Sequence, residues 1–246
     1  MPDGKIAFIA AVFGLAGLVK GVLGLGLPTI SMGLLAIVMT PLQAAAILVL
    51  PSFLTNVWQM AAGPSLKTAL RRLWPMQAAV CLGTWAGTGL MTGSYARYGG
   101  IVLGITLMIY AVTGFSSLRL SIDKAQEAWL GPIAGTATGL IAAATGVFVI
   151  PSVPYLQALD LDKEDFVQAL GLSFTISTTA LAVNLTFAGA LNVRMAGTTL
   201  LALAMACGGM WIGQILRSRM SPALFRRCFF IGLLLLGAYL ASVSLQ

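Results

Sequence analysis

The stretch Cys81-Leu-Gly-Thr-Trp-Ala-Gly87 recurs as Cys207-Gly-Gly-Met-Trp-Ile-Gly213, so one C-x-G-x-W-x-G pattern occurs twice, 126 residues apart. A second pair of landmarks lies upstream, where Ala16-Gly17 with Gly21 matches Ala134-Gly135 with Gly139 at a spacing of 118. The spacing drifts by only a few residues, so both pairs fit one internal repeat of about half the chain.

A pair of helix starts lies between these landmarks, at Thr40-Pro-Leu-Gln43 and Asp162-Lys-Glu-Asp165, which are 122 residues apart. Each start has an N-cap residue followed three positions later by an amide or acidic residue, as in a capping box. Three matches in the same order predict a tandem duplication, with one repeat in residues 1–122 and the other in residues 123–246.

The composition assigns the chain to the membrane. Of 246 residues, 59% are hydrophobic and 9% are charged, whereas soluble proteins carry about 25% charged residues. The net charge of +7 comes mostly from residues in short loops between apolar stretches, which indicates a topology signal rather than nucleic-acid binding. The apolar run after Lys5 resembles a signal peptide, but we interpret it as the first membrane helix because no clean cleavage site follows.

Eight segments are long and apolar enough for membrane helices, which need about 20 residues. They are 6–26, 42–62, 73–92, 98–118, 127–145, 165–187, 194–216 and 223–244. Two further apolar stretches, 28–39 and 147–159, are short for a crossing, and each follows a glycine-containing break.

The basic residues decide between eight and ten crossings. With eight, they divide almost evenly between the two sides. With ten, Lys5, Arg97 and Arg194 lie outside, Lys20 lies within a span, and all the others are cytoplasmic, as the positive-inside rule expects. These others are Lys67, Arg71, Arg72, Arg119, Lys124, Lys163, Arg217, Arg219, Arg226 and Arg227. We therefore expect an all-α, multi-pass protein of a bacterial inner membrane, with two inverted repeats of about five segments and both termini periplasmic.

The two breaks carry a family resemblance. They are Gly21-Val-Leu-Gly24-Leu-Gly26-Leu-Pro28 and Thr145-Gly146-Val-Phe-Val-Ile-Pro151. Together with the duplicated layout of roughly 250 residues, they resemble the TauE/SafE family of sulfite-exporter-like transporters over nearly the whole chain. The resemblance implies the transport, often outward, of sulfite, sulfoacetate or a related organosulfur anion.

Lys20 is the leading candidate for a substrate-binding residue. It lies deep in the first predicted span, where a charge costs about 2.5–3.5 kcal/mol on insertion scales. A functional Lys20 would pair with an anionic substrate. The alternative is that its side chain reaches the membrane interface, because the break is only a few residues away.

The breaks themselves form the second candidate. Helices restarting at Leu27-Pro28-Thr29 and at Thr145-Gly146 would direct free N–H groups into the protein, and helix N-termini attract anions. Gly26 and the hydroxyls of Thr29, Ser31 and Thr145 would complete one anion cradle between the repeats. The alternative is that the glycines are hinges or close-packing positions.

The third candidate is a polar set on the long helix that follows each short segment. The first copy contains Thr55, Asn56 and Gln59, and the second contains Ser173, Ser177 and Thr178. At the spacing of 122, Thr55 matches Ser177 and Asn56 matches Thr178. Such side chains can equally bond their own helix or a neighbouring one.

Residue types argue against several mechanisms. Histidine is absent and the seven carboxylates lie in loops or at span ends, so a buried proton relay is disfavoured. With no nucleophile–base pair or metal cluster in the pattern, we expect no enzyme, cofactor or metal. The expected partners are a small anion and lipid, not nucleic acid, with a homodimer as an option. Alternatives to the exporter are an anion channel, a carrier of carboxylates or other organic anions, and a non-transporting scaffold.

Overall fold

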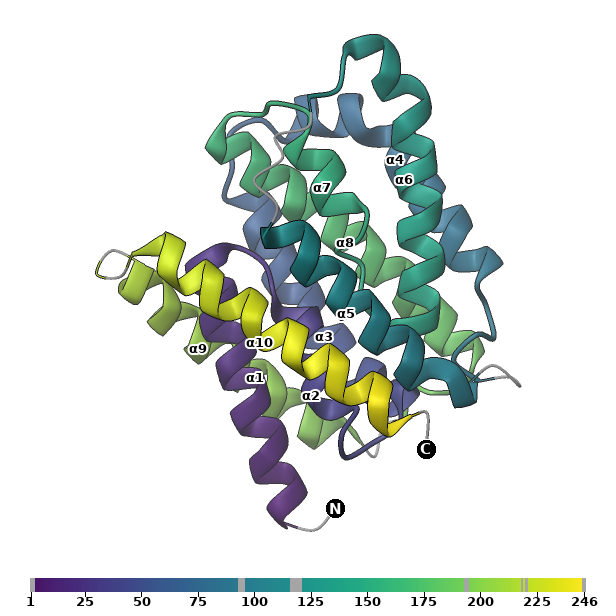
Figure 1. Cartoon of the computed structure of the whole chain (residues 1–246), viewed down its shortest axis with the longest axis vertical. Coiled ribbons are helices and arrows are strands. Elements are labelled where there is room, and N and C mark those ends of the chain that lie inside the picture. Colours follow the sequence, from purple (N-terminus) through teal and green to yellow (C-terminus); the bar gives the residue numbers. More distant parts are fainter. Residues whose placement is uncertain are drawn as a thin grey trace.

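A computed structural model describes residues 3–92, 96–115, 121–192, 195–217, 219 and 221–244, which are helical apart from loops and one 3-10 turn (Figure 1). The helices are α1 (Asp3–Leu23), α2 (Leu27–Leu35), α3 (Pro41–Ala61), α4 (Leu66–Ala86), α5 (Gly99–Phe115), α6 (Lys124–Thr145), α7 (Ser152–Gln157), α8 (Lys163–Phe187), α9 (Ala196–Arg217) and α10 (Pro222–Val243). The all-helical prediction is confirmed for this part of the chain.

The eight predicted long segments correspond to eight of these helices. Six of them, α1, α3, α6, α8, α9 and α10, are long and apolar enough to cross a membrane. The other two fall short for different reasons. α4 begins earlier than predicted and includes Lys67, Arg71 and Arg72, while α5 has 17 residues. The chain is therefore a multi-pass membrane protein.

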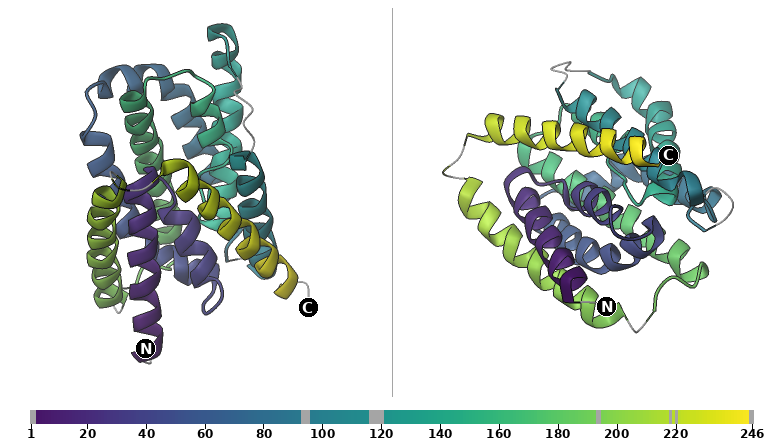
Figure 2. Two further views of the ribbon diagram at one scale, coloured as in Figure 1. Left: turned by 60° about the vertical axis from the view of Figure 1, so that its left-hand side comes forward. Right: turned by 60° about the horizontal axis from the view of Figure 1, so that its bottom comes forward.

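The two short predicted segments form α2 and α7, with 9 and 6 residues. At 1.5 Å per residue these helices are about 14 and 9 Å long, against a hydrocarbon thickness of about 30 Å. Neither helix can cross the bilayer on its own. Instead, α2 turns back beside α1 after the first break (Figure 2), and most of its residues are buried.

The long helices pack in one spatial series, in the order α1, α9, α3, α8, α4, α6. α3 and α8 pack against each other at its centre. Figures 1 and 2 show α1 and α9 towards the end that carries the N-terminus, with α4 and α6 towards the opposite end. α5 and α10 form a separate pair, and α10 also contacts α2.

Glycines of the sequence landmarks lie at the closest helix contacts. A Cβ added at Gly17 or Gly209 would collide with the backbone of the facing helix in the α1–α9 pair, and one added at Gly139 or Gly83 would do the same in the α4–α6 pair. Small residues allow this approach of two helices in a membrane. The cysteine and tryptophan of each C-x-G-x-W-x-G copy instead lie exposed.

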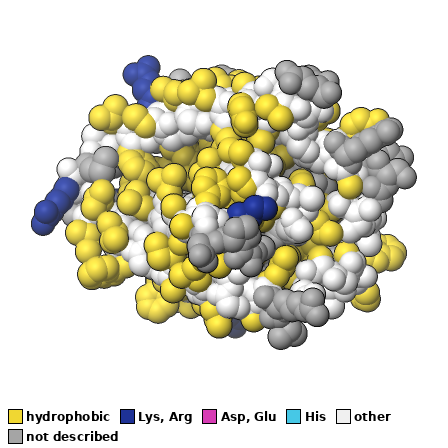
Figure 3. Space-filling view, turned by 90° about the horizontal axis from the view of Figure 1, so that it is seen from below, with side chains coloured by type: hydrophobic (Ala, Val, Ile, Leu, Met, Phe, Trp, Pro, Cys, Tyr) yellow, Lys and Arg dark blue, Asp and Glu magenta, His cyan; other side chains and the backbone are white. Residues whose placement is uncertain are grey.

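The outer surface is strongly apolar. Figure 3 shows hydrophobic side chains across the face seen from below, with only isolated Lys or Arg side chains. All five tryptophans are exposed, by 55% to 74%. An apolar outside is expected where lipid is the solvent, and tryptophan favours the membrane–water interface.

The two predicted helix starts behave differently. Thr40 caps α3 as predicted, because its hydroxyl accepts from the Gln43 amide N–H and the Gln43 side chain accepts from the Thr40 N–H. Asp162 occupies the N-cap of α8, but its side chain makes no capping hydrogen bond. The predicted N-cap position of Asp162 is thus confirmed, but its side chain does not make the predicted capping hydrogen bond.

Candidate functional site

Lys20 points into the protein. It lies in the last turn of α1 with 4% of its surface exposed, and its Nζ donates a hydrogen bond to Asn56 Oδ1 on α3. The alternative that its side chain reaches the membrane interface is therefore wrong. An ammonium group has three donors, and Asn56 is its one hydrogen-bond partner among the described residues.

Asn56 connects Lys20 to a polar cluster between three helices. Its Nδ2 donates to Ser52 Oγ at 3.2 Å and to Thr178 Oγ1 on α8 at 3.3 Å, and the two hydroxyls lie 3.4 Å apart. Thr178 also donates to the Phe174 carbonyl at 2.6 Å. We call Lys20, Ser52, Asn56 and Thr178 the Lys20 cluster. All four side chains are buried, so the cluster is closed to the outside in this structure.

When its amino group is protonated, Lys20 brings one positive charge that no described carboxylate balances. The carboxylates whose side chains are described, namely Asp123, Glu127, Asp160, Asp162, Glu164 and Asp165, are absent from the buried residues. The one described ion pair joins Arg72 to Glu127, away from the cluster. Because a buried charge is costly unless it is paired, the arrangement favours a bound anion.

The first break lies next to the cluster and is held in place by its neighbours. Gly24 and Gly26 adopt positive φ values of 77° and 109°, and Gly26 is the N-cap of α2. Thr29 Oγ1 donates to the Gly26 carbonyl at 2.9 Å. Gln59 Nε2 donates to Gly24 O at 3.0 Å and to Val167 O at 3.1 Å, which ties the break to α8. The predicted helix restart at Leu27 is confirmed.

The second break differs from the prediction. Thr145 is the last residue of α6 and Gly146 is its C-cap with φ 72°, so these residues end a helix. The predicted helix N-terminus at Thr145-Gly146 is wrong, because a glycine with positive φ terminates a helix. Thr145 Oγ1 donates to Ile141 O and accepts from the Val147 N–H, and Gly146 packs on Met32 of α2. The next helix begins only at Ser152.

Of the other predicted polar residues, some bond a neighbouring group and others have no hydrogen-bond partner among the described residues. Thr55 donates to Pro51 O on its own helix, and Ser173 accepts from Gln77 Nε2 at 2.7 Å. The hydroxyls of Ser31 and Ser177 are buried without a hydrogen-bond partner. The structure thus joins Asn56 and Thr178 to Lys20 and places Thr55 outside the cluster.

Eight of the buried polar residues that the structure describes were not among the predicted site residues, namely Ser52, Gln77, Thr84, Thr106, Thr138, Ser152, Gln168 and Thr175. Two of them carried a signal in the sequence. Ser52 lies one helical turn before Asn56 and so shares its face. Thr138 lies 118 residues after Lys20, which is the spacing of the glycine landmarks.

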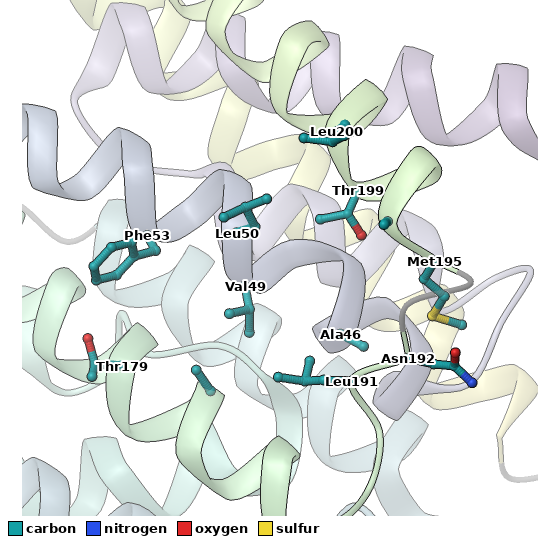
Figure 4. Close-up of a pocket in the computed structure, with 12 residues that line it drawn as sticks. Ala46, Val49, Leu50, Phe53, Thr179, Leu191, Asn192, Met195, Thr199 and Leu200 are labelled. Atoms are coloured by element: carbon teal, nitrogen blue, oxygen red, sulfur yellow. The ribbon is translucent and has the colours of Figure 1, made fainter.

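A cavity of about 610 Å³ lies between α3, α8 and the start of α9, apart from the Lys20 cluster (Figure 4). It is lined by Ala46, Val49, Leu50, Phe53, Thr179, Ala182, Leu191, Asn192, Met195, Ala196, Thr199 and Leu200. None of its lining residues belongs to the Lys20 cluster. No charged side chain lines the cavity, so it lacks the cation that an anion site needs.

Comparison with known proteins gives one match. The family model described as sulfite exporter TauE/SafE matches residues 9–240. No curated protein and no solved structure matches the chain. The family match spans nearly all the described helices, including both breaks and every residue of the Lys20 cluster. The chain therefore belongs to the TauE/SafE family of sulfite exporters, and it is a membrane transport protein.

Proposed function

We propose that this protein exports a small anion, either sulfite or an organosulfonate such as sulfoacetate, that binds at Lys20 between two inverted repeats. The observation that carries the proposal is the buried Lys20 ammonium, which has a single described partner and no described carboxylate beside it. An anion would balance this charge and use the remaining N–H donors of the ammonium.

Helix packing supports the duplicated architecture. α1 packs on α9 as α6 packs on α4, and α3 packs on α9 as α8 packs on α4. In the proposed repeat, α1 corresponds to α6, α3 to α8, α4 to α9 and α5 to α10. Replacing each helix by its counterpart therefore converts the α1–α9 pair into α6–α4 and the α3–α9 pair into α8–α4. The same replacement maps the α3–α8 and α5–α10 pairs onto themselves. Asn56 and Thr178, which are 122 residues apart, hydrogen-bond to each other. A site at that bond would lie between repeats 1–122 and 123–246.

Transport through a closed cluster requires movement. In inverted-repeat carriers the two halves rock around a central site and expose it to each side in turn. The α1–α2 turn starts beside Lys20, where the Gly24 N–H donates to the Lys20 carbonyl, so a displacement of the first break would move Lys20 and open the cluster. The break is bounded by glycines, which accommodate changes in φ.

The same architecture supports a proposed membrane orientation. Because α2 turns back beside α1, the N-terminus and the start of α3 face the same side, as in the ten-segment prediction. With the Lys67, Arg71 and Arg72 cluster cytoplasmic, both termini are periplasmic in a bacterial inner membrane.

Flux through proteoliposomes tests the role of Lys20. We expect Lys20→Ala to abolish saturable sulfite flux, while Lys5→Ala, which removes an exposed lysine from the same helix, leaves it unchanged. Both variants must elute as folded protein. Undiminished flux with folded Lys20→Ala would refute the proposal. Stimulation by counterflow would identify a carrier, since an anion channel gives none.

A further inference from the structure

The two repeats differ in charge at one equivalent position. Lys20 precedes Gly21, which contacts α9, and Thr138 precedes Gly139, which makes the matching contact with α4. The repeat thus places a lysine in α1 where it places a threonine in α6. Thr138 is fully buried, and its Oγ1 has no hydrogen-bond partner.

The described residues supply no second cation. Lys20 is the one buried basic residue among them, and the other basic side chains that the structure describes are exposed. Asn56, Ser52 and Thr178 contribute neutral amide and hydroxyl groups. The Lys20 cluster therefore offers one positive charge together with neutral hydrogen-bonding groups.

A single buried charge favours a single opposite charge. The Born cost of moving an ion out of water rises with the square of its charge, so a dianion loses about four times as much hydration as a monoanion of equal radius. Its attraction to one ammonium group only doubles. A dianion would leave a net negative charge buried, whereas a monoanion leaves none.

We infer that the site selects singly charged anions, such as hydrogensulfite, monosulfonates and monocarboxylates, over dianions. The anionic group pairs with Lys20, and Thr138, which corresponds to Lys20 in the other repeat, adds no second charge. This inference rests on the proposed function and refines it. Of the two substrates named there, it favours sulfite in its hydrogensulfite form over sulfoacetate, which carries both a sulfonate and a carboxylate.

Binding of matched anions to the purified full chain tests the selectivity directly. Methanesulfonate is compared with sulfoacetate, and acetate with malonate, by isothermal titration calorimetry. Each monoanion should bind on the order of tenfold more tightly than its dianionic counterpart, which corresponds to about 1.4 kcal/mol. Equal or tighter binding of the dianions would overturn the inference and leave the proposed function standing.

The protonation of sulfite gives a second test that needs no variant. As pH falls through the second ionisation of sulfurous acid, flux should follow the fraction present as hydrogensulfite. Methanesulfonate keeps one charge throughout, so its flux corrects for every other effect of pH. Corrected flux that follows the doubly charged form would contradict the inference.

A second lysine should change the preference. Thr138→Lys should shift binding towards sulfoacetate and malonate by on the order of tenfold. Thr106→Lys is the control, because it replaces a buried threonine on α5 at a position that does not correspond to Lys20 in the repeat. Folded Thr138→Lys with the wild-type preference would refute the part given to Thr138. If Thr138→Lys does not fold, the two tests on the wild-type chain decide the inference.

Failure of the proposed function has a different signature. In that case no anion binds, or Lys20→Ala binds anions as the wild type does. The inference of monoanion selectivity would then fail together with the proposed binding site.

Discussion

At the scale of single residues, the buried ammonium group of Lys20 has few hydrogen-bond partners. Lys20 depends on Asn56, and Asn56 also bonds two hydroxyls. Removing one partner of a buried hydrogen bond leaves the other unsatisfied, whereas replacing both with apolar groups can be nearly neutral.

We therefore expect Asn56→Leu to destabilise the protein by about 1–3 kcal/mol, because it leaves the ammonium group unpaired. The double variant Lys20→Met, Asn56→Leu should recover much of this loss. Reversible unfolding in mixed micelles measures both free energies, and a double-mutant cycle gives the coupling. Purely additive effects would show that the two side chains do not interact.

Single residues also show where sequence reasoning succeeds and fails. Lys20 and Asn56 were predicted because a charge and an amide in apolar helices demand partners. Ser52 was missed because serine is common in membrane helices and usually bonds its own backbone. Thr145 and Gly146 were misassigned because a glycine-containing break contains both a helix end and a helix start. Only the backbone φ of Gly146 identifies it as an end.

At the scale of helices, glycine spacing controls which pairs approach closely. In the second C-x-G-x-W-x-G copy, a Cβ at Gly209 would meet the backbone of Gly14 and Leu18, while one at Gly208 would meet nothing within 4 Å. Two adjacent glycines thus have opposite surroundings on one helix.

We expect Gly209→Ala to destabilise the α1–α9 contact by about 1–3 kcal/mol, as overpacking does. Gly208→Ala is the matched control and should be neutral or stabilise by up to about 1 kcal/mol, since alanine favours helix. Thermal unfolding in detergent compares the two variants. Equal effects would show that α1 and α9 are not in close contact at Gly209.

The positions of most helices followed from apolar length, although α4 begins and ends earlier than predicted, and the landmark glycines marked the contact faces. The pairing of the helices could not be predicted from the sequence. A repeat shows that α1 corresponds to α6, but it leaves open whether α1 packs within its own repeat or on the other one. The observed α1–α9 and α4–α6 pairs cross between the predicted repeats, and only three-dimensional packing decides that.

At the scale of the whole molecule, orientation remains a prediction from charge. Reporter fusions at positions 72 and 119 should report the cytoplasm, and a fusion at the C-terminus should report the periplasm, because basic loops stay inside. Arg119 lies outside the described residues, so the fusion tests its side of the membrane by sequence alone. A cytoplasmic C-terminus would overturn the ten-segment topology.

The exposure of all five tryptophans has a spectroscopic consequence. Because none of the indole rings is buried in the protein interior, intrinsic fluorescence will report the lipid or detergent shell more than the folded core. Brominated acyl chains should quench it strongly in bilayers, and the bromine position that quenches most will give the depth of the rings. Emission changes on heating will then track the surrounding shell, so unfolding is better measured by circular dichroism.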